Sequence, residues 1–244
     1  MRKNEIKQAF TLAEILITLG IIGIVASITI PALVAKYQEL VFKTKWKNLY
    51  SKISNAYIMT RNELGISDTD EMFSSKDELN MVLTEMRKKL NVKTQRYDPK
   101  CGGGADCSYG GGYIDSYKTL HGTKMNPYTF GGYKDTLGDK RIWDTIDNAT
   151  VYFRANDFYN IFIIYIFVDV NGTNSPPNIL GKDFFALVLT PVGSCPIGGK
   201  CGYRPQYFEN SCAKDKEVYA SSLNGMHSGS PISGIGCSAE VLLK

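Results

Sequence analysis

The sequence predicts an α+β protein. A long N-terminal helix, with a membrane half and an amphipathic half, is expected to pack against a small antiparallel sheet with disulfide-stapled loops. Three observations predict this. Residues 15–35 carry no charge, residues 37–64 lack Gly and Pro and show helical apolar spacing, and residues 159–168 and 184–189 are β-branched and aromatic.

The composition narrows the class of protein. Of the 244 residues, 43% are hydrophobic and 21% are charged, which excludes disorder of the whole chain. The net charge of +4 is mild and no dense Lys/Arg stripe is present, so no nucleic-acid partner is predicted. The 23 glycines, 15 tyrosines and 6 cysteines are unusual, and most of them follow the apolar segment.

The apolar segment 15–35 is long enough to cross a membrane. As a helix it spans about 30 Å, the thickness of a hydrocarbon core. Its polar residues Thr18, Ser27 and Thr29 are small enough to hydrogen bond to their own helix. The short, net positive stretch 1–8 precedes it, which predicts a cytoplasmic start and an exported remainder.

Three interpretations compete for this segment. A cleaved secretory signal needs small residues at positions −3 and −1 of a cut that follows the apolar run. A cut after Ala35 would place the large Leu33 at position −3, and the tolerable site Val25-Ala26-Ser27 lies inside the run. An ordinary membrane anchor is the second interpretation. The third rests on Glu14, because a carboxylate beside an apolar span is costly and marks a functional candidate. Alternatively, the Glu14 side chain extends to the level of the lipid headgroups and has no further role.

The N-terminus carries a resemblance to a known family. Residues 9–14 read AFTLAE and are followed by an uninterrupted apolar helix containing Pro31. This pattern resembles the start of type IV pilins and type II secretion pseudopilins. In that family a prepilin peptidase cuts before the Phe and methylates the new amine, which places the cut between Ala9 and Phe10. Ala9 departs from the family, which strongly prefers Gly at that position.

The resemblance implies a fibre subunit. Glu14 would bind the N-terminal amine of a neighbouring subunit, with Thr11 and Pro31 also serving assembly. The implied partners are other pilin or pseudopilin subunits, the prepilin peptidase and an inner-membrane assembly platform. The implied location is the inner membrane of a bacterium, with a periplasmic head, and then an extracellular pilus or a periplasmic pseudopilus.

The segments after the membrane half set the expected domain organisation. A leader (1–9) and a membrane or fibre-core helix (10–35) are followed by its amphipathic continuation (36–65) and a head (66–244). The continuation is expected to use an apolar stripe, place its basic residues on the other side, and stop at Gly65. The stripe comprises Tyr37, Leu40, Val41, Leu49, Ile53, Ala56, Tyr57 and Leu64, and the basic residues include Arg61.

A second helix is expected over residues 76–91. Ser75 and Glu78 match a capping box. Its buried stripe would comprise Leu79, Val82, Leu83, Met86 and Leu90. Residues 95–141 are rich in Gly and Tyr and show no periodicity, which predicts a long surface loop, either a variable surface or a binding face of unknown ligand.

Strands are predicted at 150–153, 159–168 and 184–189. Between the last two, Asp169-Val170-Asn171-Gly172 predicts a turn. The DxNG…GKDF pattern also resembles the strand connection of pseudopilin heads, some of which bind Ca²⁺ in this region. Asp169, Asn171 and Asp183 could supply oxygen ligands, although the turn alone accounts for Asp169 and Asn171.

All six cysteines follow the apolar segment, which fits an exported, oxidising location. Two Cys-x5-Cys loops favour Cys101–Cys107 and Cys195–Cys201, which leaves Cys212 with Cys237; other pairings among the last four stay open. A zinc site is disfavoured because five residues separate the cysteines of each pair, whereas zinc sites usually have two to four, and no histidine lies beside them. The Cys-rich region 191–244 has few apolar runs, so staples are expected to hold it.

No catalytic motif is found, and the chain is not expected to be an enzyme. Both histidines lie in glycine-rich stretches, and no nucleophile elbow or carboxylate pair is recognisable. The favoured function is a structural subunit of a type IV pilus or a type II secretion pseudopilus. The alternative is a membrane-anchored periplasmic or surface binding protein or enzyme. Major pilin, minor pilin and pseudopilin are not separated by the sequence.

Overall fold

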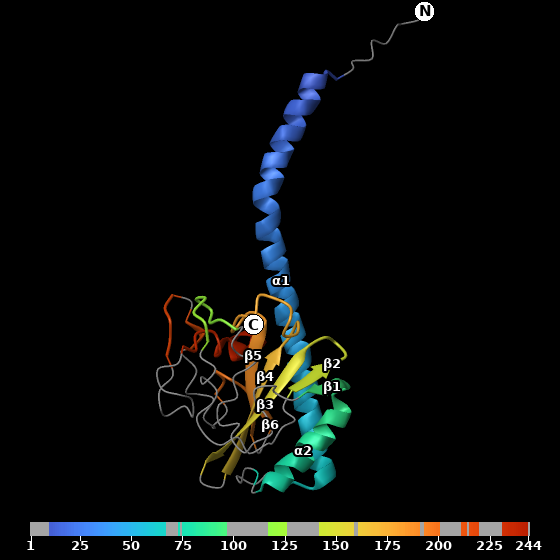
Figure 1. The fold of residues 1–244 in the computed structure, drawn as a ribbon, viewed down its shortest axis with the longest axis vertical. Coiled ribbons are helices and arrows are strands. Elements are labelled where there is room, and N and C mark those ends of the chain that lie inside the picture. Colours follow the sequence, from blue (N-terminus) through green and yellow to red (C-terminus); the bar gives the residue numbers. More distant parts are fainter. Residues whose placement is uncertain are drawn as a thin grey trace, which may run out of the picture. The chain divides into compact units, whose positions relative to one another are not determined.

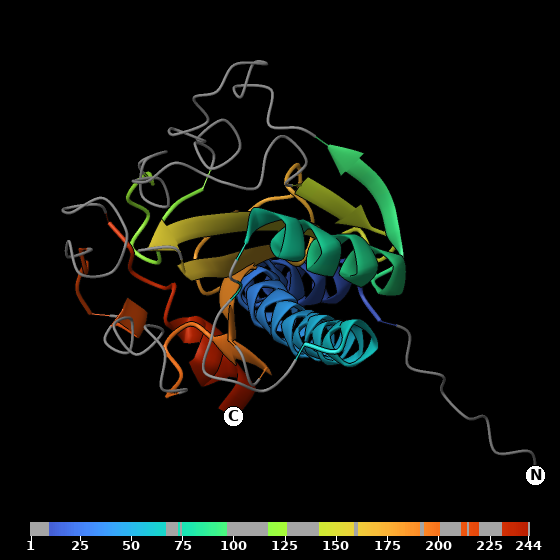
Figure 2. The same ribbon diagram turned by 90° about the horizontal axis from the view of Figure 1, so that it is seen from below.

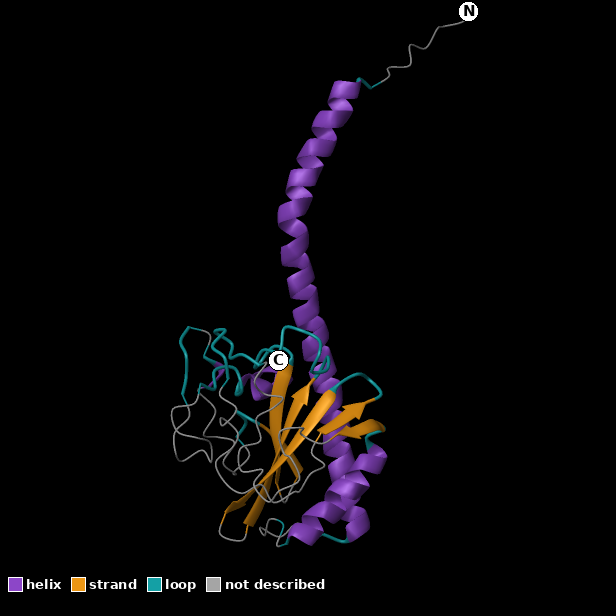
Figure 3. Ribbon diagram, in the orientation of Figure 1, coloured by secondary structure: helices purple, strands orange, loops and turns teal. Residues whose placement is uncertain are grey.

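The computed structural model describes residues 10–66, 73, 75–96, 117–125, 142–158, 161–190, 193–200, 211–213, 215–219 and 231–243. The chain forms two compact units, Met1–Val41 and Phe42–Lys244. The described helices and strands, shown in Figures 1 and 3, are α1 (Leu12–Leu64), α2 (Lys76–Lys89), β1 (Val92–Arg96), β2 (Ile142–Thr145), β3 (Thr150–Phe158), β4 (Ile161–Asp169), β5 (Phe184–Thr190), β6 (Gly193–Pro196) and α3 (Cys237–Leu243).

The described part of the first unit is helix with exposed apolar side chains. Ile28 is 71% exposed and Leu33 is 69% exposed, and no residue of the apolar window is buried. The hydroxyls of Thr18, Ser27 and Thr29 donate to the backbone carbonyls of Ile15, Ile24 and Val25 at 2.7–3.0 Å. The predicted back-bonding is therefore confirmed. By length and composition this helix suits a membrane anchor or a signal sequence.

In the second unit, one face of α1 is buried. The buried side chains are Trp46, Leu49, Ile53, Ala56, Tyr57, Thr60 and Arg61. The helix ends as predicted at Gly65, whose φ of 67° reverses the chain while Ile66 N–H donates to the Arg61 carbonyl at 3.0 Å.

Two expectations for the sides of α1 are wrong. Tyr37 and Leu40 belong to the predicted apolar stripe but are 66% and 63% exposed. Arg61 belongs to the basic side predicted to face solvent but is 4% exposed. Its guanidinium lies 5.7 Å from the centre of the Tyr57 ring, and this cation–π contact helps a buried charge to be tolerated. The charge of Arg61 alone therefore predicts the wrong side of the helix, because the long apolar stem of an arginine can be buried.

Helix α2 follows the prediction closely. The Ser75 hydroxyl accepts from the Glu78 N–H at 3.1 Å, and the expected stripe is buried except for Leu90, which is partly buried. The helix ends at Lys89 rather than at residue 91. Asn91 adopts a positive φ of 50°, which stops the helix and starts β1. In Figure 2, α1 and α2 lie side by side on one side of the strands.

The sheet has six antiparallel strands in sequence order, β1 to β6. The strand expected at 150–153 extends to Phe158 as β3, and β4 and β5 match the two apolar runs. Strands β1, β2 and β6 were not predicted. They are four or five residues long, and β1 and β6 are mostly polar, whereas β2 has two buried apolar residues, Ile142 and Trp143. Such short segments carry too little hydrophobic pattern to predict a strand.

Both faces of the sheet are buried. One face packs on α1 and α2 through Phe153, Ile166 and Leu187 among others. The other face presents Tyr152, Phe167 and Val188 to side chains from segments far apart in the sequence. These segments contribute Tyr117, Met125, Leu180, Ile197, Ile232 and Ile235.

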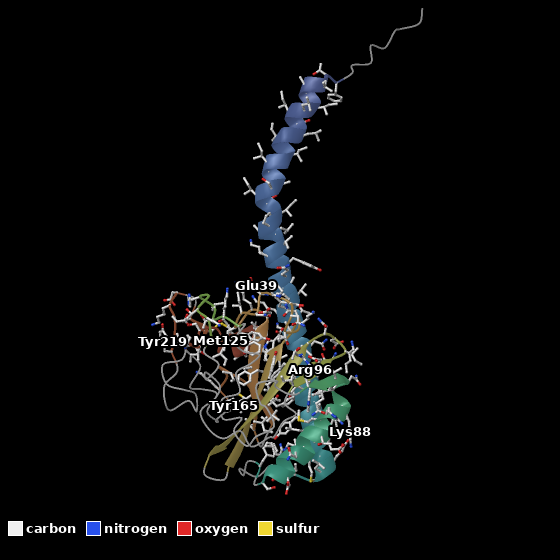
Figure 4. The ribbon with its side chains drawn as sticks, in the orientation of Figure 1. Glu39, Lys88, Arg96, Met125, Tyr165 and Tyr219 are labelled. Atoms are coloured by element: carbon white, nitrogen blue, oxygen red, sulfur yellow. A yellow bond between two sulfur atoms is a disulfide. The ribbon has the colours of Figure 1, made fainter. Side chains whose placement is uncertain are left out.

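The side chains that cover the second face of the sheet contradict the expected surface loop at residues 95–141. The described part of residues 95–141 includes Tyr117 and Met125, which are 0% and 1% exposed. Glu217 accepts hydrogen bonds from the hydroxyls of Thr119 and Thr123 at 2.8 and 2.7 Å and from the Ser233 N–H at 3.3 Å. Segments 117–125, 215–219 and 231–236 thus form one cover over the sheet. In Figure 4, Met125 and Arg96 lie to either side of the central strands.

The C-terminal segment is fastened to both the sheet and α1. The Ser238 hydroxyl accepts from the Ala186 N–H at 2.8 Å, and the Ser238 carbonyl accepts from Trp46 Nε1–H at 3.0 Å. The Trp46 ring stacks on Phe185 with ring centres 5.0 Å apart. Trp46, Phe185 and α3 therefore meet in one buried junction that the sequence analysis did not anticipate.

Replacing Trp46 by phenylalanine is expected to lower the free energy of unfolding by about 2 kcal/mol, because the Ser238 carbonyl loses a buried hydrogen bond and the smaller ring fills less of the core. Tyr50→Phe is the control, since its hydroxyl donates to the Ser194 carbonyl from a partly buried position and its loss should cost at most about 1 kcal/mol. Chemical denaturation of the full chain in detergent, followed by circular dichroism, measures both. Equal costs would contradict the role of the junction.

Candidate functional site

A reciprocal pair of hydrogen bonds begins α1. The Glu14 N–H donates to Thr11 Oγ1 at 3.3 Å, and Glu14 Oε2 accepts from the Thr11 N–H at 2.9 Å and the Thr11 hydroxyl at 2.8 Å. This is a capping box, in which two residues three positions apart satisfy each other's free amide. The carboxylate also lies where the helix N-terminus carries partial positive charge. This internal role was not among the predictions, although the Thr-x-x-Glu pattern of residues 11–14 is typical of a capping box.

The other predicted N-terminal residues are not part of this box. Phe10 is 83% exposed, and Ala9 lies outside the described residues. Pro31 lies inside α1, which stays helical on both sides of it. The predicted assembly residues Thr11 and Glu14 contact each other, whereas Pro31 lies several turns away along the same helix.

In the second unit, the carboxylates of Asp169 and Asp183 hold the connection between β4 and β5. Asp169 Oδ1 accepts from the N–H groups of Asn171 and Gly172 at 3.1 and 2.9 Å. Asp183 accepts from the N–H groups of Asn178 and Ile179 at 2.8 and 2.7 Å. Both aspartates are 0% exposed, so the expected turn is present and is built on buried charged groups.

Asn171 completes this cluster. Its amide nitrogen donates to the carbonyls of Ser175 and Pro176 at 2.8 and 3.1 Å. Its side-chain oxygen is buried and has no hydrogen-bond partner among the described residues. The structure therefore brings the three predicted oxygen donors, Asp169, Asn171 and Asp183, into the same loop.

A tyrosine pair joins the cluster from another segment. The Tyr117 hydroxyl donates to Asp169 Oδ2 and lies 3.2 Å from the Tyr152 hydroxyl, which in turn lies 2.9 Å from Thr173 Oγ1. Burial raises the pKa of Tyr117 and raises the pKa of Tyr152 to about 12. The sequence gave no indication of this contact, because Tyr117 lies in an aperiodic region.

Burial shifts the pKa of both carboxyl groups of the cluster upward. Burial raises the pKa of Asp169 to about 6 and outweighs its hydrogen bonds from Tyr117, Asn171 and Gly172, and the nearby Asp183 charge acts in the same direction. Burial also raises the pKa of Asp183.

The calcium hypothesis can be compared with this donor set. Calcium takes roughly six to eight oxygen ligands, and the loop offers two carboxylates and the unpaired Asn171 oxygen. Every oxygen of the two carboxylates already accepts an N–H or O–H donor. Hydrogen bonding therefore accounts for the loop, and calcium binding stays a prediction.

Asp169→Asn is expected to change how stability depends on pH. The folded-state pKa of Asp169 lies above the value of about 3.9 for an unfolded aspartate, so its contribution to stability is fully present below that value and is lost as the pH rises through 6. The free energy of unfolding of the wild type, relative to Asp169→Asn, should fall by about 1 kcal/mol between about pH 5 and about pH 7.5.

Chemical denaturation of the full chain in detergent at several pH values measures this difference. The exposed Asp215 provides a matched variant, Asp215→Asn, that removes one acidic side chain outside the cluster. Parallel profiles for the wild type and Asp169→Asn would contradict the prediction.

The cysteines are accounted for in part. Cys212 and Cys237 form a disulfide, as the elimination of the shorter loops suggested. Cys195 is also disulfide-bonded, and its partner is not among the described residues. The predicted Cys101–Cys107 and Cys201 lie outside the described residues.

Near the C-terminus, Cys212, Cys237 and Glu240 approach within 4.8 Å of one another. In the described part of the chain this is the one group of its kind. Because both sulfurs are bonded to each other, neither is a thiolate that could bind a metal. The group therefore fastens α3 rather than forming a metal site.

No protein-family model, curated protein or solved structure matches this chain.

Proposed function

We propose that this chain is a pilin-like structural subunit of a type IV pilus or a type II secretion pseudopilus. It is made as a single-pass inner-membrane precursor, cut between Ala9 and Phe10, and assembled into a fibre through the first half of α1. The second unit then forms the exposed head. The proposal rests on the resemblance of residues 9–14 and on the properties of α1.

One observation carries the proposal: a single helix changes its environment along its length. Its first part exposes large apolar side chains such as Ile28 and Leu33, far more than a soluble surface tolerates. Its second part buries Trp46, Leu49 and Ile53 in a folded core. A membrane would cover the first part before assembly, and the helices of other subunits would cover it in a fibre.

The position of Glu14 supports a role beyond anchoring. The carboxylate caps its own helix, which would also serve a simple anchor, but a charge that has no partner of opposite sign beside an apolar segment is costly. Cleavage before Phe10 would create an amine four residues away on each chain. A neighbouring amine would supply the opposite charge and would fix the stagger between subunits.

Mass spectrometry of the mature N-terminus tests the proposal. The full chain is expressed in a host with a prepilin peptidase and in the same host without it. We expect a chain that begins at methylated Phe10 in the first host and an intact Met1 in the second. A chain that starts at Met1 in both hosts, or after Ser27, would instead support the membrane-anchored binding protein or enzyme.

Ala9→Gly and Ala9→Glu are the matched variants for this experiment. Glycine restores the residue that the family prefers before the cut, so processing should be at least as complete as in the wild type. Glutamate adds bulk and charge at the same position and should block processing. Equal processing of both variants would mean that residue 9 is not read by the peptidase.

A further inference from the structure

We propose that the second unit binds the anionic headgroups of a lipid membrane through a cluster of four lysines. All four are exposed, and the lysine cluster comprises Lys118, Lys124, Lys182 and Lys216. The inference rests on the proposed function only in requiring that the apolar segment 15–35 spans a membrane. It goes further because it gives the head a lipid partner before any fibre forms.

Backbone pairing brings three of these lysines together. Lys118 lies opposite Lys124 in an antiparallel bridge, and on its other side it lies opposite Ile179 in a parallel bridge. Lys182 follows in the turn that starts at Ile179, where its N–H donates to the Ile179 carbonyl at 3.1 Å. Neighbouring stretches of backbone therefore present three exposed lysines side by side.

Lys216 comes from a further segment, 215–219. Glu217 fastens this segment to residues 117–125, because its carboxylate accepts hydrogen bonds from two threonine hydroxyls there at 2.8 and 2.7 Å. Asp215 is the one exposed acidic residue in these two segments and the turn before β5, as far as the structure describes them. The exposed charge of this surface is therefore strongly positive.

The pair of Lys118 and Lys124 is unfavourable without an anion. The backbone hydrogen bonds between their two strands, at 2.8 and 3.0 Å, join the residues on either side of them, so they form a non-hydrogen-bonded pair, in which opposite side chains are closest. Like charges placed directly opposite each other repel. Within the described residues, no ion pair involves a lysine of the cluster. A negatively charged surface would relieve this repulsion.

The lysine cluster lies at the end of the sheet where α1 enters the second unit. Lys182 stands two residues before the first residue of β5. Phe185, the second residue of β5, stacks on Trp46 in the first buried turn of α1. The other end of β5 instead contacts Tyr57, whose hydroxyl donates to the Thr190 carbonyl at 3.0 Å.

The same end of the sheet is the one that the chain connects to the apolar segment. Trp46 follows the last residue of segment 15–35 by eleven positions, all of them within α1. Eleven helical residues have a length of about 16 Å, so this end stays within a short reach of the headgroups. Each lysine near an anionic surface strengthens binding by about fivefold. Such a contact is reversible, so it would hold the head at the membrane without preventing its extraction.

Lysine labelling of the unprocessed full chain tests the inference. The chain is placed in nanodiscs of phosphatidylcholine, alone or mixed equally with phosphatidylglycerol, and acetylation of each lysine is followed by mass spectrometry. The lysine cluster should be labelled about fivefold more slowly in the anionic discs, and high salt should abolish the difference. Lys93, which is exposed on β1 at the opposite edge of the sheet from β6, should be labelled equally fast in both.

The double variant Lys118→Gln with Lys124→Gln removes the repelling pair. In anionic discs, Lys182 and Lys216 should then regain the labelling rate of the phosphatidylcholine discs, because the remaining charge binds lipid far more weakly. In neutral detergent, the free energy of unfolding should stay the same or rise, because only a repulsion is lost. A purely structural role of the two lysines would instead lower it.

Lys88→Gln with Lys93→Gln is the matched control, because it removes two exposed lysines from α2 and β1 and should leave the slow labelling of the cluster unchanged. Equal labelling of the cluster in both kinds of disc, or equal slowing of Lys93, would overturn the inference. Slow labelling found only in assembled fibres would also overturn it and would assign the lysines to an acidic neighbouring subunit. The test needs neither cleavage nor fibres, so its failure leaves the proposed function standing, whereas an N-terminus at Met1 in both hosts refutes the proposed function.

Discussion

Replacing Glu14 by alanine is expected to leave membrane insertion intact and to reduce incorporation into fibres about tenfold or more. Insertion depends on the uncharged residues 15–35, which the substitution does not touch. Assembly would lose its counter-charge; a tenfold change corresponds to about 1.4 kcal/mol, which is less than the usual cost of removing one partner from a poorly solvated ion pair. The measurement is the ratio of tagged variant to wild type in sheared fibres and in membranes.

Glu14→Gln makes this test specific for charge. Glutamine keeps the length of the side chain and a carbonyl oxygen that can accept from the two donors of Thr11. The helix start is therefore preserved while the charge is lost, and we expect the same defect as with alanine. Glu39→Gln, which removes an acidic group further along α1, is the control. Normal incorporation of Glu14→Gln would show that Glu14 acts through capping alone.

Replacing Gly234 by alanine is expected to destabilise the second unit by about 3 kcal/mol or more, because it combines a steric clash with backbone strain. A Cβ atom at Gly234 would lie 2.3 Å from the Leu180 carbonyl oxygen, which belongs to backbone and cannot rotate away. The φ of 104° is also unfavourable for any residue with a Cβ. Chemical denaturation of the full chain in detergent provides the measurement.

Gly122→Ala separates the two causes. Gly122 also has a positive φ, 84°, but a Cβ atom there would meet nothing within 4 Å. Its substitution therefore reports strain without a clash and should cost about 1–2 kcal/mol. If both variants lose the same stability, the close approach between Leu180 and the C-terminal segment is not what makes Gly234 necessary.

The sequence was most informative where a pattern repeats. The stripe of α2, the end of α1 at Gly65 and the two apolar strands β4 and β5 each carry a periodic or continuous signal, and each is present. The pairing of Cys212 with Cys237 followed from the short spacing of the other cysteines. These features are local, so a single stretch of sequence is enough to predict them.

The features that were missed depend on distant residues. Strands β1 and β6 are too short and polar to be predicted from their own sequence. They form because they pair with the edges of β2 and β5. The burial of Tyr117 requires a sheet face that is assembled by other segments. In the candidate sites, the residue types of Asp169, Asn171 and Asp183 were recognised, but the tyrosine pair beside them was not. The capping role of Glu14, by contrast, is local and could be predicted from the Thr-x-x-Glu pattern alone.

The junction between Trp46 and Ser238 has a consequence for folding order. Its hydrogen bond joins residues that are 192 positions apart, so the loop that closes when it forms contains most of the chain. Contacts of such long range pay a large entropy cost before they stabilise anything, and they slow folding. The core of the second unit cannot be complete until α3 has joined α1 and β5, so this unit gains its full stability only after a slow, long-range step.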